Sequence, residues 1–240
     1  MSGTTTDQHH DPATAPTPPA TAPVPVVRRQ ATTDVALVAT FAAFIAVCSI
    51  VPGVPGPAGV PFTLQTFAVV LAGLVLGARR GLAAVALYLV VGLAGVPVFA
   101  DHSAGLAVLT GPTGGYLVGF LAAATVAGAL AGPALHVATR TLGDGTGRAG
   151  RGALARLAAR PWWRGGVRYV ALLVAGLVAS PVVLDVFGIA GLVWRAGLSF
   201  HAAFAANLPF VPGDVIKTAL AALVALTVFR AFPDLARTRR

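Results

Sequence analysis

The chain has 240 residues, of which 56% are hydrophobic and 10% are charged, and its mean hydropathy is +0.81. Soluble domains carry about 25% charged residues, so this composition excludes an ordinary soluble domain and indicates a polytopic, all-α membrane protein. The formal net charge of +9 comes largely from arginines that flank apolar segments, which favours a topology signal over nucleic-acid binding.

The N-terminal residues, 1–31, are rich in Pro, Thr and Ala and contain no apolar run. Such a composition cannot bury enough surface to fold, so we expect a disordered cytoplasmic tail. The remaining chain holds six apolar segments, and we predict transmembrane helices at about 34–51, 62–77, 82–96, 111–138, 169–194 and 212–229.

The first predicted span contains pairs of small residues spaced four apart, namely Ala39, Ala42, Ala43 and Ala46. This spacing lets helices approach each other closely in lipid, although an alanine-rich chain also produces it by chance. The loop that follows, Val51–Pro61, has four prolines and three glycines and is incompatible with a regular helix. We expect it to lie outside the membrane or to line a cavity.

Polar, uncharged residues begin the second predicted span, where Thr63, Gln65 and Thr66 can form hydrogen bonds. The fourth span begins with GPTGGY, Gly111–Tyr116, which predicts a tight turn into a helix whose first N–H groups are unpaired. His102, in the loop between the third and fourth spans, is interpreted as an exposed loop residue rather than a metal ligand.

Arginines gather in the segment 140–168, which contains seven of them and is predicted to be a basic cytoplasmic loop. The fifth span carries Asp185 near its middle, and we expect this residue to face the bundle interior or to be protonated. Fifteen of the seventeen basic residues fall on one side of a six-span map, which places both termini in the cytoplasm.

The last span begins with PFVPGDVIKTAL, Pro209–Leu220, which contains Lys217, the only lysine of the chain. Asp214 lies three residues earlier and therefore on the same helix face. One interpretation is a self-neutralising pair that anchors the helix end at the headgroups. We favour a functional site, because ionisable residues within a membrane span are costly and are functional by default.

Four motifs resemble those of the BioY family, the biotin-specific S components of energy-coupling factor (ECF) transporters. They are VPFTLQTFAVVLAGLVLG (60–77), GLAGVPVF (92–99), GPTGGYLVGF (111–120) and PFVPGDVIK (209–217). The resemblance implies a single six-helix domain over residues 32–230, between the tail and a basic C-terminal segment, 231–240. It also implies a cell-membrane protein with its ligand pocket near the outer surface.

The resemblance further implies that biotin binds Asp214 and Lys217, with Thr63, Gln65, Gly114 and Tyr116 at or near the pocket. The alanines at 39, 42, 43 and 46 match a stripe that docks the transmembrane T component in many S components. The other implied partners are ATP-binding cassette ATPases, because this sequence has no Walker motif.

Two other classes of function are weighed against this one. A stand-alone secondary carrier for biotin or another vitamin is an alternative, although no inverted repeat is visible. An intramembrane enzyme is disfavoured, because the sequence shows no HExxH motif and no set of paired aspartates. We therefore expect no catalytic residue, no metal site and no cofactor.

Overall fold

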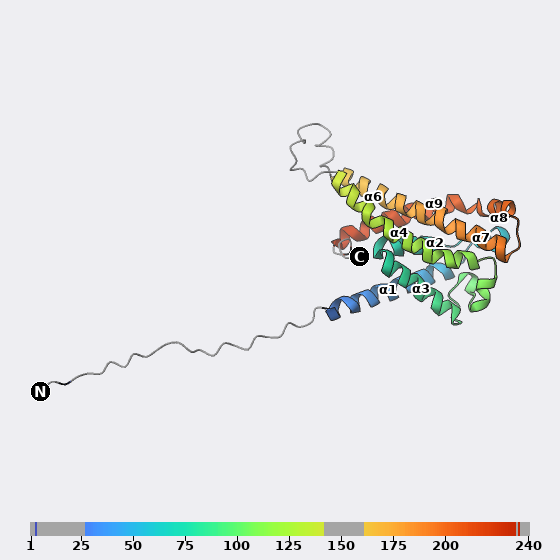
Figure 1. Ribbon diagram of the computed structural model, residues 1–240, viewed down its shortest axis with the longest axis horizontal. Coiled ribbons are helices and arrows are strands. Elements are labelled where there is room, and N and C mark those ends of the chain that lie inside the picture. The colour runs from blue at the N-terminus through green and yellow to red at the C-terminus, as the bar shows by residue number, and fades with distance from the viewer. Residues whose placement is uncertain (1–2, 4–26, 142–160, 234, 236–240) are drawn as a thin grey trace.

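The computed structural model describes residue 3, residues 27–141, residues 161–233 and residue 235. The long helices of this part of the chain lie side by side along one axis (Figure 1). The α-helices are α1 (Val27–Ile50), α2 (Gln65–Leu76), α3 (Ala78–Leu93), α4 (Gly114–Thr141), α6 (Pro161–Leu177), α7 (Asp185–Arg195), α8 (Phe200–Asn207) and α9 (Phe210–Ala231).

Shorter helical segments join these helices. They are the 3-10 turns η1 (Pro57–Gly59), η2 (Ala100–His102) and η3 (Leu106–Thr110), and the π-helical segment η4 (Val178–Leu184). The one β-type pairing among the described residues is an isolated bridge between Val54 and Phe62. The all-helical fold class predicted from the sequence is therefore confirmed.

Within the described part of the chain, four helical segments are long and apolar enough to cross a membrane, at 31–50, 114–138, 163–195 and 210–231. The remaining two predicted spans correspond to α2, which has 12 residues, and α3, which has 16. The predicted elements thus occur in the predicted order, but two of them are shorter than a typical spanning helix of about 20 residues.

Beyond shifts of a few residues at the other helix ends, three features differ from the sequence prediction. Helix α1 begins at Val27, so residues 27–31 are helical instead of belonging to the tail. Helix α6 begins at Pro161, so the last part of the predicted basic loop is also helical. The predicted connection before α9 contains α8, which Ser199 caps by accepting a hydrogen bond from the backbone N–H of Ala202 at 3.2 Å. The rest of the tail and residues 142–160 of the basic loop lie outside the described residues.

Helix α2 forms the centre of the bundle. All of its residues except Phe67 are buried, and α3, α4 and α9 pack around it. Glycines make other close contacts of the bundle possible, since a Cβ atom on Gly128 of α4 would lie 2.7 Å from the Cα atom of Ala78 in α3. Similarly, a Cβ atom on Gly191 of α7 would lie 2.6 Å from the Cα atom of Gly115 in α4. Backbone-to-backbone contact thus fixes α4 against α3 and α7.

The irregular segments gather at one end of the bundle. The connections from α1 to α2 and from α3 to α4 lie there, together with α8, whereas α1 begins and α9 ends at the opposite end (Figure 1). The Pro/Gly loop after α1 and the turn before α4 are therefore neighbours in space, as a shared site would require.

Candidate ligand-binding site

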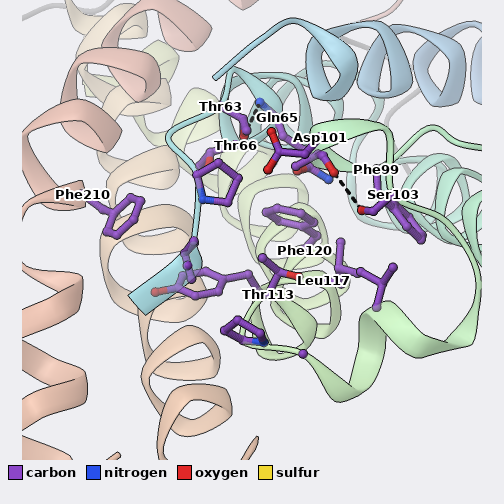
Figure 2. Close-up of a pocket in the computed structure, with 18 of the residues that line it drawn as sticks. Thr63, Gln65, Thr66, Phe99, Asp101, Ser103, Thr113, Leu117, Phe120 and Phe210 are labelled. Atoms are coloured by element: carbon purple, nitrogen blue, oxygen red, sulfur yellow. Dashed lines mark hydrogen bonds between the residues drawn. The ribbon is translucent and has the colours of Figure 1, made fainter. Parts of the chain in front are cut away.

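A cavity of about 290 Å³ opens at the end of the bundle where the irregular segments meet. Figure 2 shows residues of the loop before α2, of the loop after α3 and of α4 and α9 arranged around it. The apolar part of its wall comprises Val60, Pro61, Phe99, Val108, Pro112, Leu117, Phe120, Leu184 and Phe210. The polar part comprises Thr63, Gln65, Thr66, Asp101, Ser103, Thr113, Tyr116, Asp214 and Lys217. Its size is near the lower end of the range for small-molecule pockets.

One ion pair lies in this wall. The Nζ atom of Lys217 donates to Oδ1 of Asp214 at 3.1 Å, and the two side chains are 15% and 5% exposed. Both belong to the first two turns of α9, which places them on the same helix face. An ammonium group has three donors, so the pair leaves donors for a ligand oxygen after Asp214 has taken one.

The structure brings five of the six predicted site residues to the cavity, namely Thr63, Gln65, Tyr116, Asp214 and Lys217. Gly114 is the exception: it is buried where α4 begins and packs against the backbone of Leu109, while its neighbour Thr113 lines the cavity. The requirement for glycine at position 114 therefore comes from this close backbone contact.

Tyr116 is held by a partner that the sequence prediction did not include. Its hydroxyl donates to Oδ1 of Asn207 at 2.6 Å, and Asn207 is 3% exposed. The ring of Tyr116 packs against that of Phe210, which stacks on Phe62 with centroids 4.2 Å apart. Asn207 is the only asparagine in the chain, and this rarity was the available sequence signal.

Gln65 is fixed by a second buried network. Its Nε2 atom donates to the hydroxyl of Tyr88 at 2.6 Å, and its backbone N–H donates to Oγ1 of Thr63 at 3.3 Å. Tyr88 is 1% exposed and lies behind the cavity wall. The sequence placed Tyr88 in the third span without assigning it a role, because the contact joins residues 23 positions apart.

Asp185 lies beside the cavity at the junction of η4 and α7, and it is 4% exposed. The prediction that it faces the bundle interior is therefore confirmed. Neither carboxylate oxygen makes a hydrogen bond of ordinary geometry in the described structure, although the side chain of Asn207 lies close enough to interact with it, as do Asp214 and Lys217. Its neighbour Leu184 lines the cavity, so a π-helical segment and a buried acid adjoin the ligand site.

The four alanines of α1 lie on different faces of the helix. Ala39 and Ala43 are exposed, Ala46 is half-buried, and Ala42 is 7% exposed and belongs to the hydrophobic core. Only Ala39 and Ala43 of this set thus lie fully on the outer surface of α1.

The model of the BioY family matches residues 22–234 of this chain. The chain is 36% identical over 203 residues to the "Biotin transporter BioY" of Rhizobium etli, covering 84% of this chain and 96% of that protein. It is 35% identical over 213 residues to the Rhodobacter capsulatus protein of the same name, covering 84% and 95%. A crystal structure of "the S-component for biotin from an ECF-type ABC transporter" has the same fold, with a TM-score of 0.68, 24% identity and coverage of 84% and 93%. Together with the long apolar helices, these matches identify an integral membrane protein.

The buried carboxylate of Asp185 leads to a prediction about stability. A buried charge with incomplete hydrogen bonding opposes folding, and the neighbouring Asp214 adds repulsion that Asn207 and Lys217 offset only in part. We expect Asp185→Asn to stabilise the purified protein by about 1 kcal/mol or more, which corresponds to a rise in Tm of about 2–4 °C. Thermal unfolding in detergent measures this, with the exposed Asp101→Asn as the control. A fall in Tm would show that the ionised carboxylate is stabilised in the folded protein.

Proposed function

The chain belongs to the BioY family, and from that premise we propose that it binds biotin in the cavity described above. Its role is that of the membrane-embedded S component, which captures biotin outside the cell for uptake. The observation that carries this proposal is the combination of an apolar cavity of about 290 Å³ with Lys217, the one cation among the described residues that line it.

The chemistry of biotin matches this wall. The ligand has an apolar fused ring and chain, a ureido group and one carboxylate. Leu117, Phe120 and Phe210 provide apolar surface for the ring and chain. The carboxylate and the ureido carbonyl are oxygen acceptors, which an ammonium group binds. Thr63 and Gln65 add neutral groups that can form hydrogen bonds with the ureido group.

The role of Lys217 yields the principal test. We expect Lys217→Ala to abolish detectable biotin binding, because it leaves Asp214 or a ligand oxygen buried without its partner. Breaking a buried pair costs about 3–5 kcal/mol, which is roughly two to four decades in affinity. Calorimetry on the purified protein measures the affinity, with size-exclusion chromatography as the check on folding.

The neighbouring Ile216→Ala is the matched control, because Ile216 is 62% exposed on the outer surface of the same helix. It should bind biotin like the unmodified protein. Near-native affinity in Lys217→Ala would show that the ion pair only anchors α9, and the assignment of the site would fail.

We also propose six membrane crossings with both termini in the cytoplasm. The supporting observation is that basic residues collect at the end of the bundle opposite the cavity. Arg80 at the start of α3 pairs with Asp34 of α1 at 2.7 Å, and Arg140 and Arg230 lie in the last turns of α4 and α9. The positive-inside rule places that end in the cytoplasm and the cavity outside.

Labelling tests this topology in intact cells. We expect Ala107→Cys, in the exposed loop before α4, to react with an impermeant thiol reagent, and Arg79→Cys, at the start of α3, to remain unlabelled. Both variants carry Cys48→Ser, which removes the native thiol. Labelling at position 79 before permeabilisation, or its absence at position 107, would contradict the proposed orientation.

Uptake needs partner subunits, and we propose that these are an ECF T component and its ATP-binding cassette ATPases. The exposed residues Ala39 and Ala43 provide a smooth outer surface on α1 against which another membrane helix can pack. Ala42 and Ala46 contribute to packing within the bundle instead.

A tryptophan on this surface tests the docking proposal. We expect Ala43→Trp to retain biotin binding but to lose co-purification with the T component, because a bulky ring separates helices that pack through small residues. Ala190→Trp places the same ring at an exposed alanine of α7 and should leave assembly intact. If Ala43→Trp co-purifies normally, α1 does not dock through this surface.

A further inference from the structure

The hydroxyl of Tyr88 joins four separate parts of the fold. Gln65 of α2 donates to it at 2.6 Å, and it lies 3.0 Å from Oγ of Ser49 in α1 and 3.2 Å from the carbonyl oxygen of Val98. The side chains of Ser49, Gln65 and Tyr88 are all less than 5% exposed. Because water is excluded, the hydrogens of this network have to be shared among its own members.

Counting donors settles the direction of each bond. A phenol has one hydrogen to donate, and the carbonyl of Val98 can only accept. The phenol hydrogen therefore goes to the carbonyl of Val98, while Ser49, whose hydroxyl can also donate, can give its own hydrogen to the phenol oxygen. If Gln65 presented its oxygen instead, the same hydrogen would be drawn to Gln65, and the carbonyl of Val98 would face the phenol oxygen without a donor. Leaving a buried acceptor unpaired in this way is unfavourable.

We propose that Tyr88 orients the amide of Gln65 so that its Oε1 atom faces the cavity, and that this orientation selects ligands with an N–H donor. Gln65 lines the cavity and Tyr88 does not, so the amide nitrogen is bound on the buried side and the amide oxygen remains for the ligand. The inference rests on the function proposed above, since the ureido group of biotin carries two N–H donors.

Packing keeps the phenol in place. The ring of Tyr88 meets that of Phe99 edge to face, with centroids 5.5 Å apart and an interplanar angle of 84°. Phe99 in turn packs directly against Gly92, where any side chain would collide with its ring. Tyr88 is therefore a positioning residue: it acts on the ligand through Gln65.

The test compares biotin with two analogues, in each of which an oxygen atom replaces one ureido N–H. A buried acceptor that loses its donor weakens binding by about tenfold to a hundredfold, so the unmodified protein should discriminate against at least one analogue to that extent. Tyr88→Phe keeps the ring and frees the amide to turn. We expect this variant to reduce the discrimination by about tenfold, as measured by calorimetry.

Two further variants make the result specific. Tyr169→Phe removes a phenol that donates to the carbonyl of Ala219 at 3.4 Å, away from the cavity, and should leave the discrimination unchanged. In a Gln65→Met background, Tyr88→Phe should have no further effect on the discrimination between biotin and the analogues, since the two residues act as a unit. Should Tyr88→Phe fail to purify as a folded protein, 4-fluorophenylalanine at position 88 keeps the size of the tyrosine but donates no hydrogen.

Two outcomes would overturn the inference without contradicting biotin binding. In one, Tyr88→Phe discriminates between biotin and the analogues as well as the unmodified protein does. In the other, Tyr88→Phe reduces this discrimination as much in the Gln65→Met background as it does alone. A wild-type protein that does not bind biotin would overturn the proposed function and this inference together.

Discussion

An ammonium group is stable inside an apolar bundle only if an acid is held beside it, and the pair of Lys217 and Asp214 meets this condition at 3.1 Å. The rest of the site depends on it. The pair lies three residues apart on one helix, so the start of α9 has to lie at the cavity wall. The stacking of Phe210 on Phe62 then joins that start to the loop before α2. The ion pair and this aromatic stack thus bring the start of α9 and the loop before α2 together at the cavity wall.

The sequence was sufficient to predict the helical fold class, the order of the elements and most of the cavity wall. Those predictions rested on local patterns, such as apolar runs, proline and glycine clusters, and a rare lysine beside an aspartate. Helix ends were predicted less well, because α1 and α6 continue past the apolar segment into basic residues that the pattern assigns to loops. Helix α8 was missed for a related reason: Ser199 supplies its cap, but the polar residues around it resemble a connection.

The contacts that sequence could not predict are the ones between distant residues. Tyr116 meets Asn207 across 91 positions, and Tyr88 meets Ser49 across 39. No local pattern encodes such pairs, since each depends on how closely the helices approach. In this bundle glycines set that approach: Gly188 leaves room for the ring of Tyr116, and Gly92 for the ring of Phe99. The aromatic rings at and behind the cavity wall are therefore positioned partly by glycines, which carry no polar signal of their own.

The two sides of the cavity differ in how their polar groups are satisfied. Gln65 is bound on its buried side by a network of neutral groups, which in our proposal fixes its direction before any ligand arrives. Asp185, in contrast, is buried beside the ion pair, and neither of its carboxylate oxygens makes a hydrogen bond of ordinary geometry. A fixed network of hydrogen bonds favours selectivity for a ligand. A buried acid with incomplete hydrogen bonding reduces stability, and it persists only where the surrounding fold compensates for it. The side that carries Asp185 is also the side where η4 departs from α-helical geometry, so the departures from ideal structure concentrate where the charges lie.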